Sequence, residues 1–503
     1  MNLVKHSLGA LCLSSAVLAG CADLQPGAES NSQALALPQS DDAVRVRFAH
    51  GAPFAPALDV YVGTAETPLF AGVAFGTATP YAALASGLQL VFRAAGAPVS
   101  AAPIATTDVV AQPGEQITTV AGGLVGSSAQ SNRFRVQAYI EGFEAAERGQ
   151  ARVRFVQDSH GLSAAGFDLN ADGSIEAAGV AAFTASDPAG VVVARARRSV
   201  QLGVVIDTPA RQLTSFTLPA SLLTQDGGIF LALVGVPTFV PRDPRGLALL
   251  AIGTDSAIVI RQNPSVYVLP AIPDSTGVDV FAVGRGLQVG RFAENVGFGV
   301  LAPVLQVAPT ETGYRLIVRQ ASTDAANTTL GAALAVESTG PLEAGERYLA
   351  VASGFSDRSC GAGRDAVRVT IVRDDFDRTI TGNGRLRAIA AAADAPAVDI
   401  GQFAPGDDTE LIGIAGLDNL PYLASSAPEG AELTPDPLNP GVRVTGTTDT
   451  QGFLFRALSA TDRAFGVVAG AFAPVTGDIQ SRFIIVNTPA SGVWTAQTLT
   501  PQF

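Results

Sequence analysis

The chain of 503 residues is rich in apolar residues (47%) and poor in charged ones (15%). Its 45 acidic residues outnumber 32 basic ones, which gives a formal net charge of −13 at pH 7. This balance disfavours nucleic acid and anionic membrane surfaces as partners. The length and the apolar content are sufficient for several buried cores.

The first 20 residues predict a lipoprotein signal peptide. A basic residue, Lys5, precedes an apolar run, Ser7–Gly20, which is shorter than the roughly 20 residues that a transmembrane helix needs. The run ends in LAGC, Leu18–Cys21, which resembles the lipobox of bacterial lipoproteins. That resemblance implies cleavage before Cys21, attachment of diacylglycerol to its sulfur and acylation of the new amino group. An ordinary signal peptide with an incidental cysteine is the alternative.

Residues 21–43 predict a lipidated cysteine followed by a flexible tether. The segment is polar, contains Pro, Gly and Ser, and has no sustained periodicity. Ala22 follows Cys21, where many Gram-negative lipoproteins of the inner membrane carry aspartate. We therefore expect the outer membrane, and we leave open whether the domains face the cell surface or the periplasm.

Beyond the tether, four segments open alike, which predicts an internal repeat. Each opening combines an alternating strand, a turn-rich loop, an apolar residue, an aspartate and a second strand. The aspartates are spaced 109, 111 and 120 residues apart, and they are Asp59, Asp168, Asp279 and Asp399. The repeat predicts four domains, at residues 44–150, 151–263, 264–383 and 384–503.

The residue pattern within each repeat predicts an all-β protein of tandem β-sandwich domains, immunoglobulin-like in kind. Short runs rich in Val, Ile, Phe and Thr are broken by Gly, Pro, Asp and Asn, and long helical periodicity is scarce. Pairs of arginines alternate with apolar residues in three opening strands, so both guanidinium groups of a pair lie on one face. We expect a solvated face that discourages pairing between sheet edges, with binding of an acidic glycan as the alternative. The pairs are Arg45/Arg47, Arg152/Arg154 and Arg385/Arg387.

The first repeat resembles a known family. Its runs are VRVRFAHGAPFAPALDVYV from Val44, LFAGVAFGTATPYAAL from Leu69 and PGEQITTVAGG from Pro113. They are similar to the bacterial domain-of-unknown-function family 4397, whose members carry H-x-x-P-x-A-P-x-x-D-V-Y and V-x-F-G-x-x-x-P-Y. The resemblance is close in the first repeat, partial in the third and fourth, and weak in the second. It implies a β-rich fold and an extracytoplasmic location, and it brings no established activity.

Few residues suggest catalysis. Beyond the signal peptide the histidines are His50 and His160, in the first and second repeats. A Ser-His-Asp site needs three converging groups and a zinc site three or four ligands. We therefore predict no catalytic residue and interpret His50 as part of a scaffold turn. The repeated aspartates are expected at strand starts, accepting backbone N–H bonds from the preceding loop. Cys360 has no histidine near it in sequence and is expected to be inert.

One loop suggests weak calcium binding. The run DLNADGSIEAAG, Asp168–Gly179, resembles the calcium loop D-x-[DN]-x-[DN]-G-x-[ILV]. The twelfth position is Gly179 instead of the bidentate Glu that such loops use. An ordinary hairpin turn is the alternative. The candidate ligands are Asp168, Asn170, Asp172 and Glu176.

Together these features predict a lipid-anchored cell-envelope protein that acts as a non-catalytic binding or structural module in adhesion, matrix or envelope scaffolding. Its partner is expected to be an envelope or extracellular protein or glycan, bound through loops and sheet edges. No cofactor is expected apart from possible calcium. An enzyme acting on wall or extracellular polymers is the alternative, although no nucleophile motif stands out.

Overall fold

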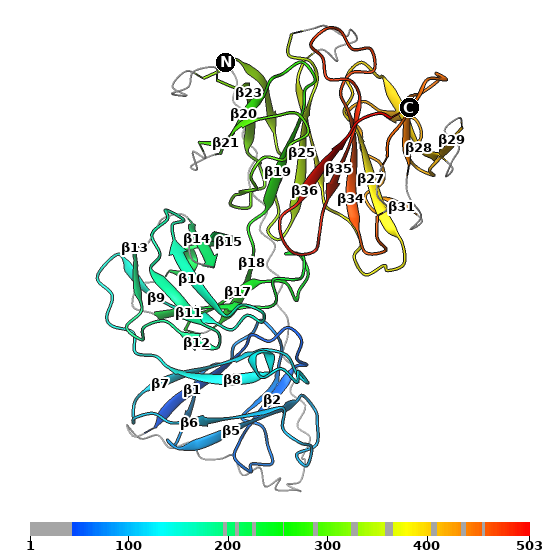
Figure 1. Cartoon of the computed structure of the whole chain (residues 1–503). Helices are drawn as coiled ribbons and strands as arrows, with labels where there is room; N and C mark the ends of the chain where they lie inside the picture. The colour runs from blue at the N-terminus through cyan, green and yellow to red at the C-terminus, as the bar shows by residue number, and fades with distance from the viewer. Residues whose placement is uncertain are drawn as a thin grey trace, which may run out of the picture.

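The computed structural model describes residues 43–502, without residues 195–198, 207–210, 224–227, 255, 285–289, 323–329, 358–365, 404–409, 434–438 and 455–457. Within these residues the helical elements are two 3-10 turns, η1 (Gln130–Asn132) and η2 (Ala220–Leu222). The expected all-β class is therefore confirmed (Figure 1). In the described part of the chain, no helix has the length and apolar character needed to cross a membrane.

The described strands form eight sheets, which stack in twos as four β-sandwiches, here called units 1 to 4. Unit 1 contains β1 (Val44–His50), β2 (Leu58–Val62), β3 (Phe70–Val73), β4 (Ala82–Leu84), β5 (Leu88–Ala94), β6 (Ala105–Val109), β7 (Gln116–Gly122) and β8 (Arg135–Ile140). Unit 2 contains β9 (Gln150–Gln157), β10 (Ala164–Leu169), β11 (Ala177–Ala181), β12 (Thr184–Ala185), β13 (Val191–Ala194), β14 (Val200–Ile206), β15 (Arg211–Leu218), β16 (Gly228–Val234), β17 (Ala248–Ile252) and β18 (Ala257–Arg261).

The second half of the chain repeats this arrangement. Unit 3 contains β19 (Ser265–Ala271), β20 (Val278–Val283), β21 (Arg291–Val296), β22 (Leu305–Gln306), β23 (Arg315–Gln320), β24 (Ala333–Ser338), β25 (Arg347–Ser353) and β26 (Arg368–Arg373). Unit 4 contains β27 (Gly384–Ala390), β28 (Ala397–Phe403), β29 (Leu411–Gly413), β30 (Leu420–Pro421), β31 (Ala431–Leu433), β32 (Pro440–Val444), β33 (Thr450–Gly452), β34 (Arg463–Ala469), β35 (Arg482–Asn487) and β36 (Thr495–Leu499).

The four units share one strand plan. In unit 1 the first sheet has the order β4-β1-β7-β8 and the second the order β3-β2-β5-β6. The opening strand runs parallel to a late strand, as β1 to β7, and the same parallel pair recurs as β9–β16, β19–β25 and β27–β34. An immunoglobulin domain instead has sheets ABED and CFG. The strand order is therefore not that of an immunoglobulin domain, because the chain crosses to the second sheet directly after its first strand.

Each sandwich encloses its own core between its two sheets. In unit 1, Phe48 of β1 lies against Phe92 of β5, with ring centroids 5.1 Å apart. In unit 2, Phe155 of β9 stacks on Phe167 of β10 at 4.5 Å. In β1 and β9 these side chains share the inner face with residues two positions away, Val46 and Val153, because successive side chains alternate between faces.

The outer faces of the first sheets are also buried, because the units pack face to face in two pairs. Units 1 and 2 form one pair and units 3 and 4 the other (Figure 1). Between units 1 and 2, Val120 of β7 and Tyr139 of β8 share an apolar cluster with Phe230 of β16 and Leu250 of β17. Between units 3 and 4, residues of β19, β25 and β26 share a second cluster with β27, β34 and β35.

Burial on both faces explains why some strands are apolar at every position. In β16, Leu231 and Leu233 point into the core of unit 2, while Phe230, Ala232 and Val234 point toward unit 1. A strand with one wet face would alternate apolar and polar residues.

The structure corrects the expected role of the arginine pairs. Arg45 is exposed, but its companion Arg47 is only 1% exposed, and Arg154 and Arg387 are 7% and 8% exposed. The second arginine of each pair thus lies in an interface between units instead of on a solvated face. The prediction failed because period two identifies the face of the sheet but not what covers it.

These buried arginines make reciprocal contacts between paired units. Arg47 of unit 1 donates to the carbonyl of Gly253, just after β17 of unit 2, and Arg154 of unit 2 donates to the carbonyl of Ile140 at the end of β8 in unit 1. In the second pair, Arg387 of unit 4 donates to the carbonyl of Arg373 at the end of β26, 2.8 Å away. Units 1 and 2 therefore face each other in an approximately twofold arrangement.

Candidate functional site

Three of the four repeat aspartates bind a left-handed residue that lies in, or just before, the neighbouring strand. Asp59 accepts the backbone N–H of Gly72 at 2.7 Å, and Asp279 accepts that of Asn295 at 2.9 Å. Asp399 accepts the N–H of Asn419 at 2.8 Å. All three donors have a positive φ, between 47° and 63°, a conformation that is strained for non-glycine residues. The donors follow the aspartate in the chain, so the expected bonding to the preceding loop is wrong.

Asp168 does not occupy this position in unit 2. The bulge between β10 and β11 lies opposite Gly166, and its left-handed residue is Gly179, with φ of 60°. Asp168 lies two residues later and accepts the N–H groups of Asp172 and Gly173, at 3.1 and 3.0 Å. The repeat spacing of 109 and 111 residues concealed this shift, because spacing alone does not reveal a two-residue displacement within a loop.

The four calcium candidates do lie together in the hairpin between β10 and β11. Asn170 has a φ of 69°, as a tight hairpin turn requires. Asp172 accepts the N–H of Ser174 at 2.9 Å, and Glu176 accepts the N–H of Leu169 at 2.6 Å. The carboxylates therefore bond to the backbone of their own loop. Nowhere among the described residues do three or more His, Cys, Asp or Glu side chains gather as metal ligands.

His50 spans the loop that connects β1 to β2. Its Nδ1 accepts the N–H of Ala52 at 3.3 Å, and its Nε2 lies 2.9 Å from the carbonyl oxygen of Pro56. Burial lowers the pKa of His50 below its ordinary value of 6.5, so the ring is neutral with its proton on Nε2. In unit 2 the same strand position is Gln157, and its amide makes the matching two bonds, at 2.8 and 3.0 Å.

His160 does not occupy the position in unit 2 that His50 occupies in unit 1. It lies three residues beyond Gln157, in the next turn, where its backbone N–H bonds to the carbonyl of Gly235 at 2.9 Å. His50 and His160 share no hydrogen-bond partner among the described residues. Cys21 and Cys360 lie outside the described residues.

An acidic group that the sequence did not single out lies in the interface of units 1 and 2. Asp158 follows β9 and is 1% exposed. One carboxylate oxygen is 3.5 Å from the hydroxyl of Tyr139 in unit 1, and the other has no hydrogen-bond partner. Burial raises the pKa of Asp158 to about 7, although the Tyr139 hydroxyl and the charge of Arg135 act in the opposite direction.

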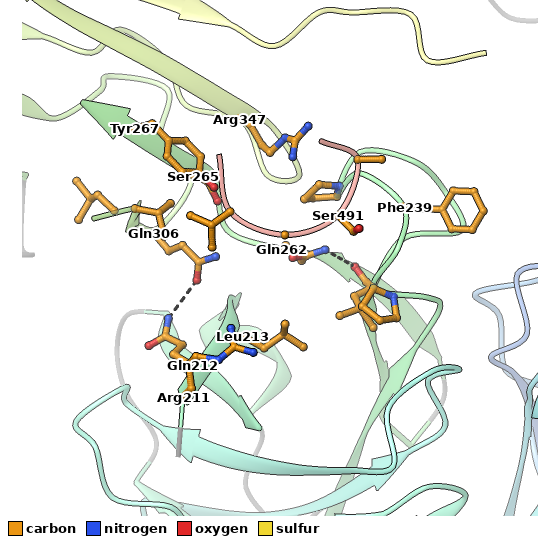
Figure 2. A pocket seen from close by; sticks show the side chains of 18 residues that line it. Arg211, Gln212, Leu213, Phe239, Gln262, Ser265, Tyr267, Gln306, Arg347 and Ser491 are labelled. Atoms are coloured by element: carbon orange, nitrogen blue, oxygen red, sulfur yellow. Dashed lines mark hydrogen bonds between the residues drawn. The ribbon is translucent and has the colours of Figure 1, made fainter. Parts of the chain in front are cut away.

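A pocket lies where units 2, 3 and 4 meet (Figure 2). Its volume is about 440 Å³, which is in the range of small-molecule sites, and such sites favour domain interfaces. Unit 2 contributes Arg211–Leu213 of β15, unit 3 contributes Val304–Gln306 around β22, and unit 4 contributes the loop Ala490–Val493. We call it the junction pocket.

Hydrogen bonds between units hold the walls of the junction pocket. The N–H of Gly345 in unit 3 donates to the carbonyl of Gln262 in unit 2 at 2.7 Å. Arg242 of unit 2 donates to the carbonyls of Asp374 and Phe376, at the end of unit 3. Because β18 ends at residue 261 and β19 begins at residue 265, the connection between the two pairs of units is short. The pocket is therefore largely preformed.

Arg347 anchors the loop of unit 4 from the wall of the pocket. Its Nε and Nη2 donate to Asp374 at 3.1 and 2.6 Å, and Arg378 donates to the same carboxylate at 2.8 and 3.0 Å, so two arginines share one anion. Its Nη1 donates to the carbonyl of Pro489 at 2.7 Å, next to the pocket loop. The guanidinium also lies 5.3 Å from the ring centroid of Trp494, a cation–π distance.

The remaining walls combine apolar side chains with the cation Arg211 and several neutral polar groups. Figure 2 shows Gln212 of unit 2 facing Gln306 of unit 3, and Nε2 of the first donates to Oε1 of the second at 3.1 Å. This bond leaves the Gln212 carbonyl oxygen and the Gln306 amide N–H groups for other partners. The side chains of Ser265 and Ser491 also border the pocket, and none of its described lining residues is Asp or Glu. The lining can therefore bind neutral or acidic polar groups.

The fold and these interfaces define a tandem β-sandwich protein whose units are paired through their first sheets. The family model "Domain of unknown function (DUF4397)" matches residues 44–193 and 264–401. These ranges cover more than half of the chain, and the chain belongs to this family. Each match begins at the first unit of a pair and extends into the second unit.

Comparisons with solved structures and curated proteins add no assignment to that family. The structure described as "Product complex of a multi-modular glycogen-degrading pneumococcal virulence factor SpuA" is similar at 9% identity and a TM-score of 0.14. That similarity spans 79% of this chain and 40% of that one, and it is too low to support an argument. No curated protein matches the chain.

We expect His50→Gln to preserve stability and His50→Leu to destabilise unit 1. Glutamine can make both loop bonds, as Gln157 does in unit 2, whereas leucine leaves buried backbone groups unsatisfied, at a cost of about 1–3 kcal/mol. Denaturant unfolding of the two variants measures this difference. Equal destabilisation by both substitutions would show that the loop bonds contribute nothing.

We expect Asp158→Asn to stabilise the protein above pH 7 and to have little effect near pH 4. The pKa of Asp158 is raised in the folded state to about 7 from 3.8, so the folded protein loses stability as pH rises through this window, by about 4 kcal/mol in all. Asparagine cannot ionise and removes this loss. The measurement is the unfolding free energy of parent and variant from pH 4 to 8, with the exposed Asp449→Asn as control. A difference that does not change with pH would contradict the assignment.

Proposed function

We propose that this protein is a lipid-anchored cell-envelope protein that acts as a non-catalytic binding or structural module. The observation that most supports binding is the junction pocket, which three units line with apolar, neutral polar and arginine side chains. A non-catalytic role is supported by His50, whose ring nitrogens are both used in loop bonds. Three repeat aspartates likewise bind left-handed backbone residues in separate units.

Anchorage is proposed through Cys21, the last residue of the lipobox-like run Leu18–Cys21. Lipidation there places the acyl chains at one end of a tether that leads to β1 at Val44. Several acyl chains retain a protein on a membrane far better than one does. The outer membrane is the proposed location, and the proposed partner is an envelope or extracellular protein or glycan.

Anchorage is tested by Cys21→Ser. We expect this variant to lose metabolic labelling with an alkyne fatty acid and to shift from the membrane fraction to the soluble fraction, because its hydroxyl cannot form the thioether. Cys360→Ser is the matched control and keeps both properties. Labelling of Cys21→Ser at the parental level would exclude this residue as the anchor.

Binding without catalysis is tested by incubating the full-length, detergent-solubilised protein with panels of cell-wall glycans, matrix polysaccharides and peptides. We expect at least one ligand to be retained and recovered unchanged, because the described residues offer a preformed pocket and no converging acid–base constellation. Mass spectrometry of the recovered ligands is the measurement. Release of cleaved products by purified protein would overturn the proposal in favour of an enzyme.

A further inference from the structure

The junction pocket lies between two sheet edges. β15 is the last strand in the order β11-β10-β14-β15 of unit 2, and β22 is the first in the order β22-β19-β25-β26 of unit 3. An edge strand has a row of backbone N–H and C=O groups that its own sheet does not pair. Two such edges, from different units, therefore border one cavity.

The lining residues indicate that the pocket meets the edges of these strands. From unit 2 it contacts Arg211, Gln212 and Leu213 in succession, and from unit 3 it contacts Val304, Leu305 and Gln306. Successive side chains of a strand point to opposite faces of the sheet. A cavity that lay over one face would contact every second residue, so this cavity borders the backbone edge.

The chain already pairs with β15 farther along the same edge. Phe216 forms an antiparallel bridge with Gln262, and the N–H of Asn263 donates to the carbonyl of Ser215 at 2.8 Å. Both partners belong to the short connection between units 2 and 3. The edge of β15 can therefore pair with an added extended segment, and the pocket borders the same edge at residues 211–213, beyond this bridge.

The chemistry of the walls narrows the class of ligand. Leu213 and Val304 supply apolar contacts, while the Gln212 carbonyl and the Gln306 amide supply an acceptor and donors that match a peptide backbone. Since no described lining residue is acidic, and the one carboxylate bonded to Arg347 is shared with Arg378, nothing in the lining attracts a basic side chain.

From this geometry we propose that the junction pocket binds an extended peptide, neutral or acidic in side chains, that pairs its backbone with the edges of β15 and β22. This inference rests on the proposed binding function and names the ligand class of its site. Strand addition of this kind takes its affinity from main-chain hydrogen bonds and its specificity from pockets for alternate side chains.

The test begins with selection of random peptides on the full-length, detergent-solubilised protein. We expect the selected peptides to slow hydrogen exchange in residues 211–213 and 304–306. Methylation of alternate backbone nitrogens in those peptides should weaken binding at least tenfold, because it removes the main-chain donors. Ser491→Trp, which fills the pocket from an exposed loop, should also weaken binding at least tenfold, whereas Ser131→Trp, at an exposed site in η1, should change it less than twofold.

Other results separate this inference from the proposed function. Peptides that protect a different surface, or that bind equally well after methylation, would overturn the peptide assignment. Binding of an oligosaccharide that Ser491→Trp abolishes, with no selected peptide, would also overturn it but leave the binding module intact. Failure of both peptides and oligosaccharides to bind, or cleavage of either, would overturn both.

Discussion

Face-to-face burial of the first sheets within each pair is the constraint on which the rest of the structure depends. The sheet around β1 has its inner face in the core of unit 1 and its outer face against the sheet around β16. Each large apolar side chain buried in such an interface contributes about 1.5–3 kcal/mol. A single unit would expose this outer face to water, and an apolar patch of that extent is rarely left open on a monomer. The stable element is therefore the pair of units, which agrees with family matches that extend from one unit into the next.

Burial of the arginines follows from the same constraint. A guanidinium that is taken out of water loses hydration and must be compensated by acceptors. Arg47 finds them in the hydroxyl of Thr118, the carbonyl of Gly253 and the carboxylate of Glu141. In unit 3 the corresponding strand position is Tyr267, which stacks on Trp494 of unit 4 with centroids 4.3 Å apart. In that unit Arg347, on the neighbouring strand, supplies the contact with the partner unit. The position of the cation changes, but a donor to a backbone carbonyl just beyond a strand of the partner is retained.

The sequence was sufficient for the class of fold because strand periodicity and turn residues are local signals. The sequence was insufficient to predict which faces of the units pack against each other. The uninterrupted apolar run of β16 from Ile229 to Val234 was a usable signal, since only burial on both faces accounts for it, yet it does not name the covering partner. The burial of Asp158 could not be predicted, because an aspartate in a polar loop is normally expected to be exposed to solvent. The position of Asp168 was predicted wrongly because the repeats were aligned by sequence. Such an alignment does not show that the bulge in unit 2 lies two residues before the aspartate.

The junction pocket could not be derived from sequence, since its walls come from segments as far apart as residues 211 and 493. The pocket is best understood by comparison with the way the chain protects other sheet edges. Proteins usually protect sheet edges by covering, twisting or charging them, and here the connection between units covers β15 at Phe216. The part of β15 that borders the pocket lies beyond that bridge, and β22 of unit 3 borders the same pocket. Bonds from Arg242 and Gly345 join units 2 and 3 nearby. Because both edges border a cavity of about 440 Å³, the space beside them suits a single extended chain and not a second sheet. A site that selects its ligand by the shape of two strand edges needs no catalytic group. Its specificity then depends on the few side chains that alternate along those edges.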